Sequence, residues 1–201
     1  MRQLLLATNN PGKLVEMRAL LGDLGLELLA PAQVGLEMDV KEDGQTYAEN
    51  AARKAQAFAK TSGLLTLADD SGLEVDALNG APGLHSARYS PKPGATDADR
   101  RAYLLKNLLG LPQPWTARFR CVIAISTPHG ECTFTEGICP GVVIPEERGQ
   151  NGFGYDPIFF LPELGQTMAQ LEETEKNKLS HRGRAILAAR PILLQLAADG
   201  E

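Results

Sequence analysis

One short stretch constrains the chain more than any other, because an apolar run ends there in two adjacent carboxylates. Residues 64–72 read LLTLADDSG, so Asp69 and Asp70 close the run. Short apolar runs bounded by turn residues are typical of buried strands. In open α/β sheets, ligands bind at the carboxyl ends of the strands. Paired carboxylates at such an edge suit Mg²⁺, which prefers oxygen ligands and keeps waters and substrate phosphates in its shell.

The same residues, Asp-Asp-Ser-Gly, are also ordinary turn residues. Taken alone, the stretch therefore leaves two interpretations open, a metal site and a plain turn that closes the strand. Features elsewhere in the chain have to distinguish between them.

A second candidate site lies near the start of the chain. Residues 3–7 (QLLLA) predict a buried strand, TNNPGK follows at 8–13, and a helix with apolar side chains at helical spacing comes next. Backbone N–H groups and Lys13 at a helix N-terminus suit a phosphate. The stretch is not a Walker loop, because Leu14 stands where Ser or Thr should follow the lysine. A phosphate site and an ordinary strand–helix turn with a solvated lysine remain equally open.

Chain geometry brings the two stretches together. A capping box at Thr46 and Glu49 predicts a helix of about 15 residues, which spans ~22 Å. The strand that follows is roughly 20 Å long, so a tight turn returns Asp70 to the start of the helix, beside Glu42. A parallel first strand, which crossover connections favour, places Lys13 at the same edge. This convergence favours a metal site beside a phosphate site over two coincidental turns.

The later part of the chain alternates strands, loops and helices. Residues 117–126 and 131–138 predict an antiparallel hairpin, and 149–162 form a glycine-rich loop that leads into an apolar strand. The glycines of this loop do not match GxGxxG, so a dinucleotide-binding fold is not supported. Ser180 predicts the start of a terminal helix, which Pro191 should kink.

A dense basic patch precedes and begins that terminal helix. Its members are Lys176, Lys178, His181, Arg182 and Arg184. A solvated cationic face is the default interpretation. His181 and Arg182, however, fall in the first helical turn, where cations oppose the helix dipole. That conflict indicates a bound anion or hydrogen-bond acceptor.

Composition sets the class of protein. The 201 residues fit a single domain covering 1–201, and the hydrophobic fraction of 43% is ordinary for a globular protein. The net charge of −5 argues against binding nucleic acid through a basic surface, and no apolar run approaches the length of a membrane span. The start is too short for a signal peptide. Cys121, Cys132 and Cys139 are odd in number and lack metal spacing, so we expect reduced thiols and a cytoplasmic protein.

Five blocks of sequence occur together in one order. They are TNNPGK at 8–13, ENA at 49–51, ADDSGLEVDALNGAPG at 68–83, GFGYDPIF at 152–159 and EKNKLSHRG at 175–183. In this combination the chain resembles the inosine triphosphate pyrophosphatase family, the bacterial XTP/dITP diphosphatases. The resemblance spans nearly the whole chain, from Leu4 to the final helix.

The resemblance implies a fold and an activity. The fold would be α/β, with a central mixed β-sheet flanked by helices and two lobes with the active site in the cleft between them. The protein would be a homodimer that binds neither nucleic acid nor membrane. Its reaction would be the Mg²⁺-dependent hydrolysis of ITP, dITP or XTP to the monophosphate and pyrophosphate, which keeps deaminated purines out of nucleic acid.

The resemblance also assigns roles to residues. Asp70 would accept a proton from the attacking water and, with Glu42, hold the metal. Ser71 would touch the substrate. The triphosphate would contact Thr8, Asn9, Asn10, Pro11, Gly12 and Lys13, with Lys54 as a further phosphate contact. The base and sugar would lie against Phe153, Gly154, Tyr155, Asp156, Lys176, His181 and Arg182.

Two other functions remain open. A pyrophosphatase for modified pyrimidine or ordinary deoxynucleoside triphosphates would use the same metal chemistry. A non-catalytic nucleotide-binding module would need the phosphate contacts but not the pairing of Glu42 with Asp70. Metal-dependent release of pyrophosphate distinguishes an enzyme from such a module, and a panel of substrates distinguishes the two enzymes.

Overall fold

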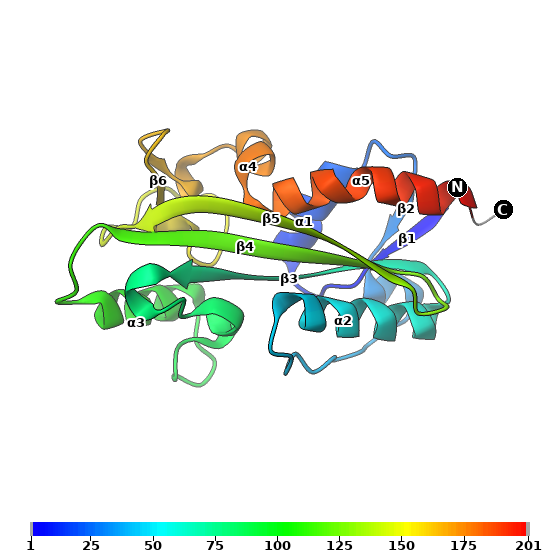
Figure 1. Ribbon diagram of the computed structural model, residues 1–201, viewed down its shortest axis with the longest axis horizontal. Coiled ribbons are helices and arrows are strands. Elements are labelled where there is room, and N and C mark those ends of the chain that lie inside the picture. Colours follow the sequence, from blue (N-terminus) through cyan, green and yellow to red (C-terminus); the bar gives the residue numbers. More distant parts are fainter. Residues whose placement is uncertain (1, 200–201) are drawn as a thin grey trace. The chain divides into compact units, whose positions relative to one another are not determined.

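The computed structural model describes residues 2–199 and contains one mixed sheet with helices packed on it (Figure 1). The strands are β1 (Gln3–Leu6), β2 (Glu27–Leu29), β3 (Leu65–Val75), β4 (Trp115–Ser126), β5 (Cys132–Val143), β6 (Phe159–Leu161) and β7 (Gln166–Thr167). The α-helices are α1 (Pro11–Leu21), α2 (Tyr47–Ser62), α3 (Asp97–Leu108), α4 (Glu173–Leu179) and α5 (His181–Asp199). Short 3-10 helices are η1 (Pro31–Val34), η2 (Asp76–Leu78), η3 (Gly83–Arg88), η4 (Asp156–Ile158) and η5 (Met168–Gln170).

The order of strands in the sheet is β2-β1-β3-β4-β5-β6-β7. β1 pairs in parallel with both β2 and β3, as the crossover rule predicts, whereas β6 pairs antiparallel with β5 and β7. The predicted α/β fold with a mixed sheet is therefore confirmed. The chain divides into two compact units, and the prediction of a single domain over 1–201 stays a prediction.

The first unit consists of the described parts of 1–70, 121–137 and 182–201. In it, α1 and α5 cover one face of the sheet and α2 covers the other (Figure 1). Side chains alternate between these faces because the period of a strand is two residues. The core under α1 and α5 contains Leu4, Leu6, Met17, Leu21, Leu67, Cys121, Ile123, Ile125, Ala185, Ile186, Ala189 and Leu193. The core under α2 contains Leu5, Ala7, Leu29, Ala51, Ala55, Phe58, Ala68 and Ala124.

β3 departs most from the sequence prediction. We expected the strand to end at Asp70, but it continues to Val75. Beyond the two carboxylates, Leu73 and Val75 are fully buried while Glu74 is partly exposed, so the alternation of a half-covered strand resumes. The interpretation of Asp-Asp-Ser-Gly as a turn is therefore wrong, and the carboxylates lie inside a strand.

The start of α2 is capped as predicted, but only in part. The Thr46 hydroxyl accepts a hydrogen bond from the backbone N–H of Glu49 at 3.1 Å. The Glu49 carboxylate accepts from the N–H of Gln45 at 2.7 Å rather than from that of Thr46, so the reciprocal half of the box is absent there. Gly63, at φ +70°, ends the helix in the left-handed conformation that glycine tolerates.

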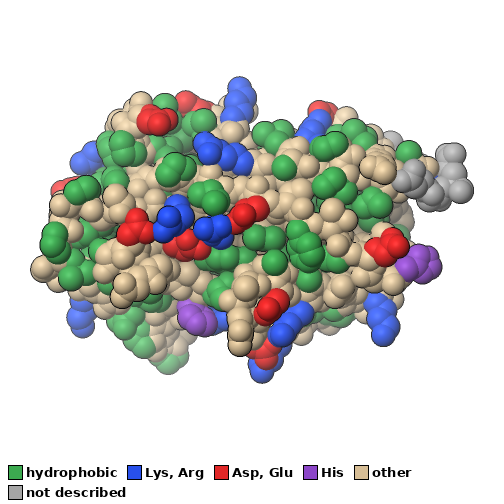
Figure 2. All heavy atoms as spheres, viewed as in Figure 1, with side chains coloured by type: hydrophobic (Ala, Val, Ile, Leu, Met, Phe, Trp, Pro, Cys, Tyr) green, Lys and Arg blue, Asp and Glu red, His purple; other side chains and the backbone are tan. Residues whose placement is uncertain are grey.

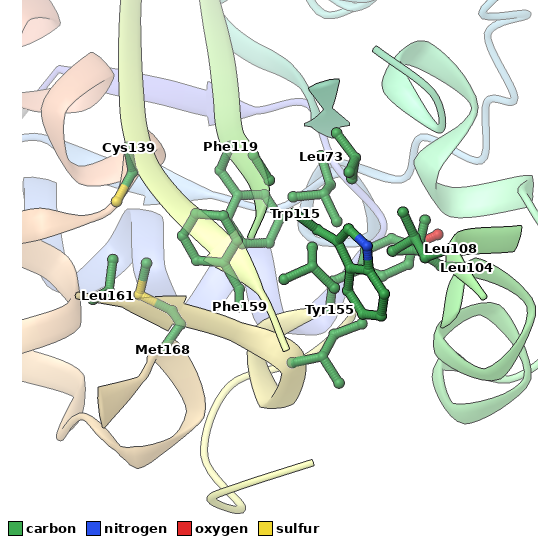
Figure 3. Close-up of a cluster of buried hydrophobic side chains, with 14 of the residues drawn as sticks. Leu73, Leu104, Leu108, Trp115, Phe119, Cys139, Tyr155, Phe159, Leu161 and Met168 are labelled. Carbon is green, nitrogen blue, oxygen red and sulfur yellow. The ribbon is translucent and has the colours of Figure 1, made fainter. Parts of the chain in front are cut away.

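The second unit consists of 71–120 and 138–181, and its core is rich in aromatic side chains. Figure 3 shows Phe119 and Phe159 in contact, with ring centroids 4.4 Å apart. The buried members of this core are Leu73, Val75, Leu104, Leu108, Trp115, Ala117, Phe119, Cys139, Val143, Tyr155, Ile158, Phe159, Leu161, Met168 and Leu171. Helix α3 contributes its leucines to this core and thereby stands close to the segment that carries Tyr155.

Two features of the later part of the chain differ from the sequence prediction. The hairpin strands are longer than predicted, because β4 begins at Trp115 and β5 reaches Val143. Helix α4 was not predicted from the sequence. Helix α5 continues through Pro191, and the kink expected at this proline stays a prediction. No helix in the described part of the chain combines the length and apolar character needed to cross a bilayer. Figure 2 shows basic and acidic side chains beside one another on the visible face.

Two phenylalanines test this description of the core. Phe159 is fully buried, whereas Phe134 on β5 is 46% exposed. Phe159→Ala should lower the free energy of unfolding by about 3–5 kcal/mol, because it leaves a cavity in a packed core. Phe134→Ala should change it by no more than about 0.5 kcal/mol. Urea denaturation measures both, and equal losses would contradict the assigned burial.

Candidate active site

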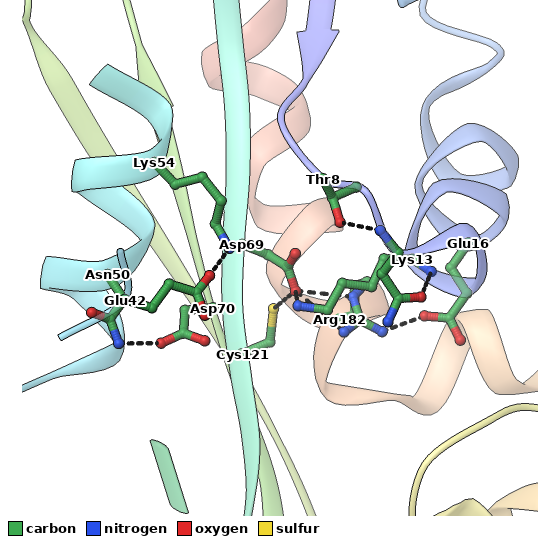
Figure 4. A network of polar contacts seen from close by, with 11 residues as sticks. Thr8, Lys13, Glu16, Glu42, Asn50, Lys54, Asp69, Asp70, Cys121 and Arg182 are labelled. Atoms are coloured by element: carbon green, nitrogen blue, oxygen red, sulfur yellow. Dashed lines mark hydrogen bonds and ion pairs between the residues drawn. The ribbon is translucent and has the colours of Figure 1, made fainter. Parts of the chain in front are cut away.

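Adjacent carboxylates on β3 point to opposite faces of the sheet (Figure 4). Leu67 packs under α1 and α5, and Ala68 packs under α2. Because side chains alternate along a strand, Asp69 follows Leu67 toward α1 and α5, while Asp70 follows Ala68 toward α2. The two carboxylates are adjacent in the sequence, but they lie in two different environments on opposite faces of the sheet.

Asp69 is the acceptor of a buried ion cluster. It is fully buried, and its Oδ2 lies 3.0 Å from Lys13 Nζ. The same oxygen accepts from Arg182 Nε at 3.3 Å and Nη2 at 3.2 Å, while Arg182 Nη1 binds the Glu16 carboxylate. Burial alone would raise the pKa of Asp69, but Lys13, Arg182 and Lys54 outweigh it and hold that pKa well below its usual range. Asp69 is thus a fixed negative charge.

Cys121 borders this cluster without taking part in its charge. Its Sγ lies 3.9 Å from Asp69 Oδ2. Burial and the Asp69 charge raise the pKa of the thiol far above its ordinary value. The thiolate is the nucleophilic form of cysteine, so Cys121 packs as a neutral side chain and is no candidate nucleophile.

Asp70 meets the start of α2, as the chain geometry predicts. Its Oδ2 accepts from Asn50 Nδ2 at 2.9 Å, and Asn50 Oδ1 accepts from the N–H of Gly44 at 2.7 Å. Burial raises the pKa of Asp70, the hydrogen bond from Asn50 opposes that rise, and the charge of Glu42 adds to it. A carboxylate whose pKa is raised above its ordinary value is better suited to accept a proton.

Glu42 and Lys54 complete this face of the site. Figure 4 shows the Glu42 carboxylate beside Asp70, with the Lys54 ammonium in contact with Glu42. Burial alone would lower the pKa of Lys54, but the charges of Asp69, Glu42 and Asp70 raise it above its ordinary value. Lys54 is therefore a cation held among three carboxylates.

The donor set of Glu42 and Asp70 fits a hard divalent cation. Both groups offer carboxylate oxygens, the ligands that Mg²⁺ prefers. Within residues 2–199, no three or more His, Cys, Asp or Glu side chains are grouped as a metal site. A metal held by these two carboxylates would therefore take its other ligands from water and substrate oxygens, which is the usual behaviour of Mg²⁺ at phosphate sites.

The turn at 8–13 forms an ordered helix N-terminus. Thr8 Oγ1 accepts from the N–H of Asn10, and Asn10 Oδ1 accepts from the N–H of Lys13, both at 3.2 Å. Pro11 occupies the first turn of α1. The Lys13 side chain is 16% exposed and reaches Asp69, so the interpretation of a solvated lysine is wrong. Asn9 is exposed and Gly12 is partly exposed beside this cation.

In the second unit, a buried ion pair supports the glycine-rich loop. Asp156 Oδ2 accepts from Lys176 Nζ at 2.7 Å and from the N–H of Phe153 at 2.9 Å. Lys176 Nζ also lies 4.9 Å from the centroid of the Phe153 ring. Gly152 has φ +74°, and a Cβ there would come within 2.1 Å of Asp156 Oδ2. The loop can therefore cover this pair only with glycine at that position.

Other predicted residues of the second unit are tightly packed. Tyr155 donates its hydroxyl hydrogen to the Ser86 carbonyl at 2.8 Å, and burial raises the pKa of this phenol well above its ordinary value. His181 stacks on Phe119, with centroids 4.7 Å apart and an interplanar angle of 13°. Ser71 is partly exposed on β3. Tyr155 and His181 thus support the site from the core.

The structure brings the predicted residues together in two groups. The first unit holds Glu42, Lys54, Asp70, Arg182 and the turn at 8–13. Arg182 is only 2% exposed. The second unit holds the remaining predicted residues, Ser71, Phe153, Gly154, Tyr155, Asp156, Lys176 and His181.

Sequence reasoning missed Glu16 and Asn50, and it treated Asp69 and Asp70 as one pair of candidate metal ligands. The structure corrects that pairing, because Asp69 lies on the face opposite Asp70 and binds Lys13 and Arg182. The alternation of the apolar residues before the pair was the available signal. Asn50 lies in the ENA block one turn after the helix cap, where a polar side chain can face the returning strand. Nothing local marks Glu16, because its partner is distant in the chain.

Replacing Asp69 tests the ion cluster. Asp69→Asn should lower the free energy of unfolding at pH 7 by about 3–5 kcal/mol, because buried cations lose their partner. The folded pKa of Asp69 is depressed, so its contribution is complete above the unfolded pKa of about 3.9 and is lost as the pH falls through the folded pKa. The difference in free energy of unfolding between wild type and variant, measured by urea denaturation, should therefore be smaller at pH 3 than at pH 7.

The exposed pair between Asp23 and Arg190 provides the control. Asp23→Asn should have little effect at either pH, because solvent screens that pair. If the loss in free energy of unfolding caused by Asp69→Asn were the same at pH 7 and pH 3, the carboxylate charge would not be what stabilises the cluster.

Comparison with known proteins places the chain in a family. A sequence model of the Ham1 family matches residues 4–192. A dITP/XTP pyrophosphatase of Desulforamulus reducens is 50% identical over 195 residues, covering 96% of each chain. One from Synechocystis sp. is 50% identical over 187 residues and 92% of each chain. The solved structure of a HAM1 protein from Coxiella burnetii is 41% identical, with a TM-score of 0.88 over 97% of this chain and 100% of that one. The family predicted from the sequence blocks is confirmed, and the chain belongs to the Ham1 family.

Proposed function

We propose that this chain hydrolyses ITP, dITP and XTP to the nucleoside monophosphate and pyrophosphate in a Mg²⁺-dependent reaction. The observation that carries the proposal is the environment of Asp70, a buried carboxylate of raised pKa beside Glu42. Two lysines, Lys13 and Lys54, stand close to the same strand. Relatives that are 50% identical to this chain bear the name dITP/XTP pyrophosphatase.

The triphosphate binds at the turn before α1. Hydrolysis of a phosphoanhydride depends mainly on positioning and on neutralising charge, so few protein groups are needed. Backbone N–H groups at the helix start and the Lys13 ammonium attract phosphate oxygens. Asp69 limits the reach of Lys13 by holding it at 3.0 Å, which gives the cation a defined position instead of a mobile one. Lys54 supplies a second positive charge.

Glu42 and Asp70 are the residues that would hold Mg²⁺. When bound, this ion would neutralise phosphate charge and lower the pKa of water. Asp70 accepts the proton of the attacking water, and burial raises the pKa of this carboxylate in the direction that proton transfer requires. Asn50 fixes the orientation of the Asp70 carboxylate through the hydrogen bond to Oδ2.

The purine is bound by the glycine-rich loop and the basic segment after it. Phe153 offers an aromatic ring for stacking, and Lys176 lies against that ring. The backbone of this region is held in place by Gly154, Tyr155, Asp156 and His181. A guanidinium has only donors and so matches the 6-keto oxygen of hypoxanthine and xanthine, although Asp69 and Glu16 engage Arg182. A base contact from Arg182 stays a prediction.

We further propose that the enzyme works as a homodimer in the cytoplasm, which the family resemblance supports. Light scattering after size-exclusion chromatography measures the mass directly. A mass near twice 21.6 kDa is expected, and a monomer at micromolar concentration would contradict this part of the proposal.

Pyrophosphate release tests the reaction itself. We expect rapid release from ITP, dITP and XTP, much slower release from GTP, ATP and dTTP, and none when EDTA removes the metal. Equal rates on all triphosphates would favour a pyrophosphatase of broad specificity. Binding of ITP without release in the presence of Mg²⁺ would favour a non-catalytic nucleotide-binding module.

Asp70→Asn tests the proton acceptor. The amide can neither accept the proton nor bind Mg²⁺ well, so kcat should fall by at least about 10²-fold. Because the folded pKa of Asp70 is raised, its charged form is disfavoured by folding, and the variant should unfold at the same urea concentration as wild type or a higher one. Asp76→Asn, at an exposed ion pair with Arg118, is the control and should retain activity. Near-normal ITP hydrolysis by Asp70→Asn would remove Asp70 from the chemistry.

A further inference from the structure

We propose that helix α3 positions the substrate-binding loop through Asp97 and Arg101, which together hold both polar backbone groups of Gly154. The inference rests on the proposed function, because it assigns these two residues to the loop that carries Phe153. We call the loop at 147–156 the purine loop and the pair Asp97–Arg101 the α3 clamp. Both belong to the second unit.

The clamp contacts Gly154 from two sides. The N–H of Gly154 donates to Asp97 Oδ2 at 2.8 Å, and Arg101 Nη1 donates to the Gly154 carbonyl at 2.8 Å. Residues four apart on a helix share one face, so Asp97 and Arg101 reach the loop together. A charged partner on each backbone group makes these hydrogen bonds stronger than neutral ones.

Arg101 also holds the beginning of the purine loop. Its Nε and Nη2 donate to the two carboxylate oxygens of Glu147, each at 2.8 Å. This is the two-point geometry in which arginine binds a carboxylate most specifically. The side chain of Arg101 is 12% exposed. One guanidinium thus joins Glu147, at the beginning of the purine loop, to Gly154, close to its end.

Asp97 is itself held in place. It is the first residue of α3, directly after the Thr96 cap, and the Arg100 guanidinium binds its other oxygen. Burial would raise the pKa of Asp97, but the bonds from Arg100 and from the N–H of Gly154 lower it. The acceptor facing Gly154 is therefore an ionised carboxylate with little freedom to turn.

The purine loop needs such support because of its own backbone. Gly154 has φ +64°, in the left-handed region, and a glycine has more backbone freedom to lose than any other residue. The N–H of Gly154 belongs to the peptide group that joins it to Phe153, so the bond to Asp97 restrains the backbone from which the aromatic side chain extends. The ion pair of Asp156 and Lys176 holds one side of Phe153, and the α3 clamp holds the other.

The same contacts limit how the loop can recognise a base. The N–H groups of Phe153, Gly154 and Asp156 all donate within the protein, to Asp156 Oδ2, to Asp97 Oδ2 and to the Phe153 carbonyl. These N–H groups are therefore not available to a base, and what the purine loop offers the substrate is the aromatic ring of Phe153, held in place. The clamp should accordingly affect substrate affinity and base discrimination, and leave the chemical step almost unchanged.

Arg101→Met is the main test, because methionine keeps much of the apolar stem and removes every donor. KM for ITP should rise about tenfold, the effect of losing one strong hydrogen bond, while kcat changes less than about twofold. The preference for ITP over ATP should fall. Hydrogen exchange of the amides in 150–156, measured on the unliganded protein, should become faster by a similar factor.

Arg118→Met is the matched control. Arg118 also joins two carboxylates, those of Glu74 and Asp76, in the same unit, and within residues 2–199 its side-chain hydrogen bonds go to these two carboxylates and not to the purine loop. The Arg118→Met variant should leave KM, base preference and loop exchange unchanged. Arg101→Lys should be intermediate, because one ammonium cannot bridge Glu147 and Gly154 with the same geometry. Asp97→Ala combined with Arg101→Met should be less than additive, because the two side chains hold the two peptide groups that flank the same residue, Gly154.

The proposal is overturned if loop exchange is the same in Arg101→Met and wild type, or if Arg118→Met changes it equally. It is also overturned if kcat falls as much as kcat/KM, since the clamp would then act on the chemistry. Failure of the proposed function looks different: wild type would not release pyrophosphate from ITP. In that case, exchange on the unliganded protein still decides whether α3 holds the loop.

Discussion

The structure of the site depends on one buried negative charge. Asp69 is fully enclosed, and its Oδ2 receives Lys13 from α1 and Arg182 from α5. The interaction joins the first turn of two helices to the middle of the sheet, so it orders the turn at 8–13 and fixes the position of the cation beside it. A buried charge is stable only with its partners, and each partner here is needed by the others. Removing any one of them would disturb both the turn at 8–13 and the core under α5.

Neighbouring residues on β3 have acquired opposite electrostatic environments. Asp69 faces cations and its pKa is lowered, whereas Asp70 faces Asn50 and Glu42 and its pKa is raised. The first arrangement favours the folded state at neutral pH, and the second opposes it. A stabilising carboxylate and the proposed proton acceptor thus stand side by side, with the sheet between their surroundings. A buried carboxylate with a raised pKa lowers the stability of the folded state, and such groups are found mainly at active sites.

The sequence was sufficient where local patterns and chain lengths determine the outcome. The parallel pairing of β1 with β3, and the return of Asp70 to the start of α2, follow from periodicity and from the rise per residue of helix and strand. The sequence did not separate Asp69 from Asp70, because turn-forming residues masked the continuation of β3. The partners of Arg182 and of Arg101 could not be predicted. Each arginine is separated along the chain from its acceptors, by 46 residues for Arg101 and Glu147 and by 113 for Arg182 and Asp69, so no local pattern indicates the pairing.

The alternation along β3 has a consequence for how such a chain can change over evolutionary time. Inserting or deleting a single residue between Leu65 and Asp69 would reverse the direction of every side chain that follows in the strand. An insertion would move Asp69 to the present place of Asp70, beside Asn50, and a deletion would move Asp70 to the present place of Asp69, beside Lys13 and Arg182. Two acidic residues would still be present, so the composition of the segment would look intact while only one of the two places held a carboxylate. A change of two residues would restore the faces but would move both carboxylates about 7 Å along the strand, away from their partners. Natural variation in length should therefore accumulate in the loops before and after the strand.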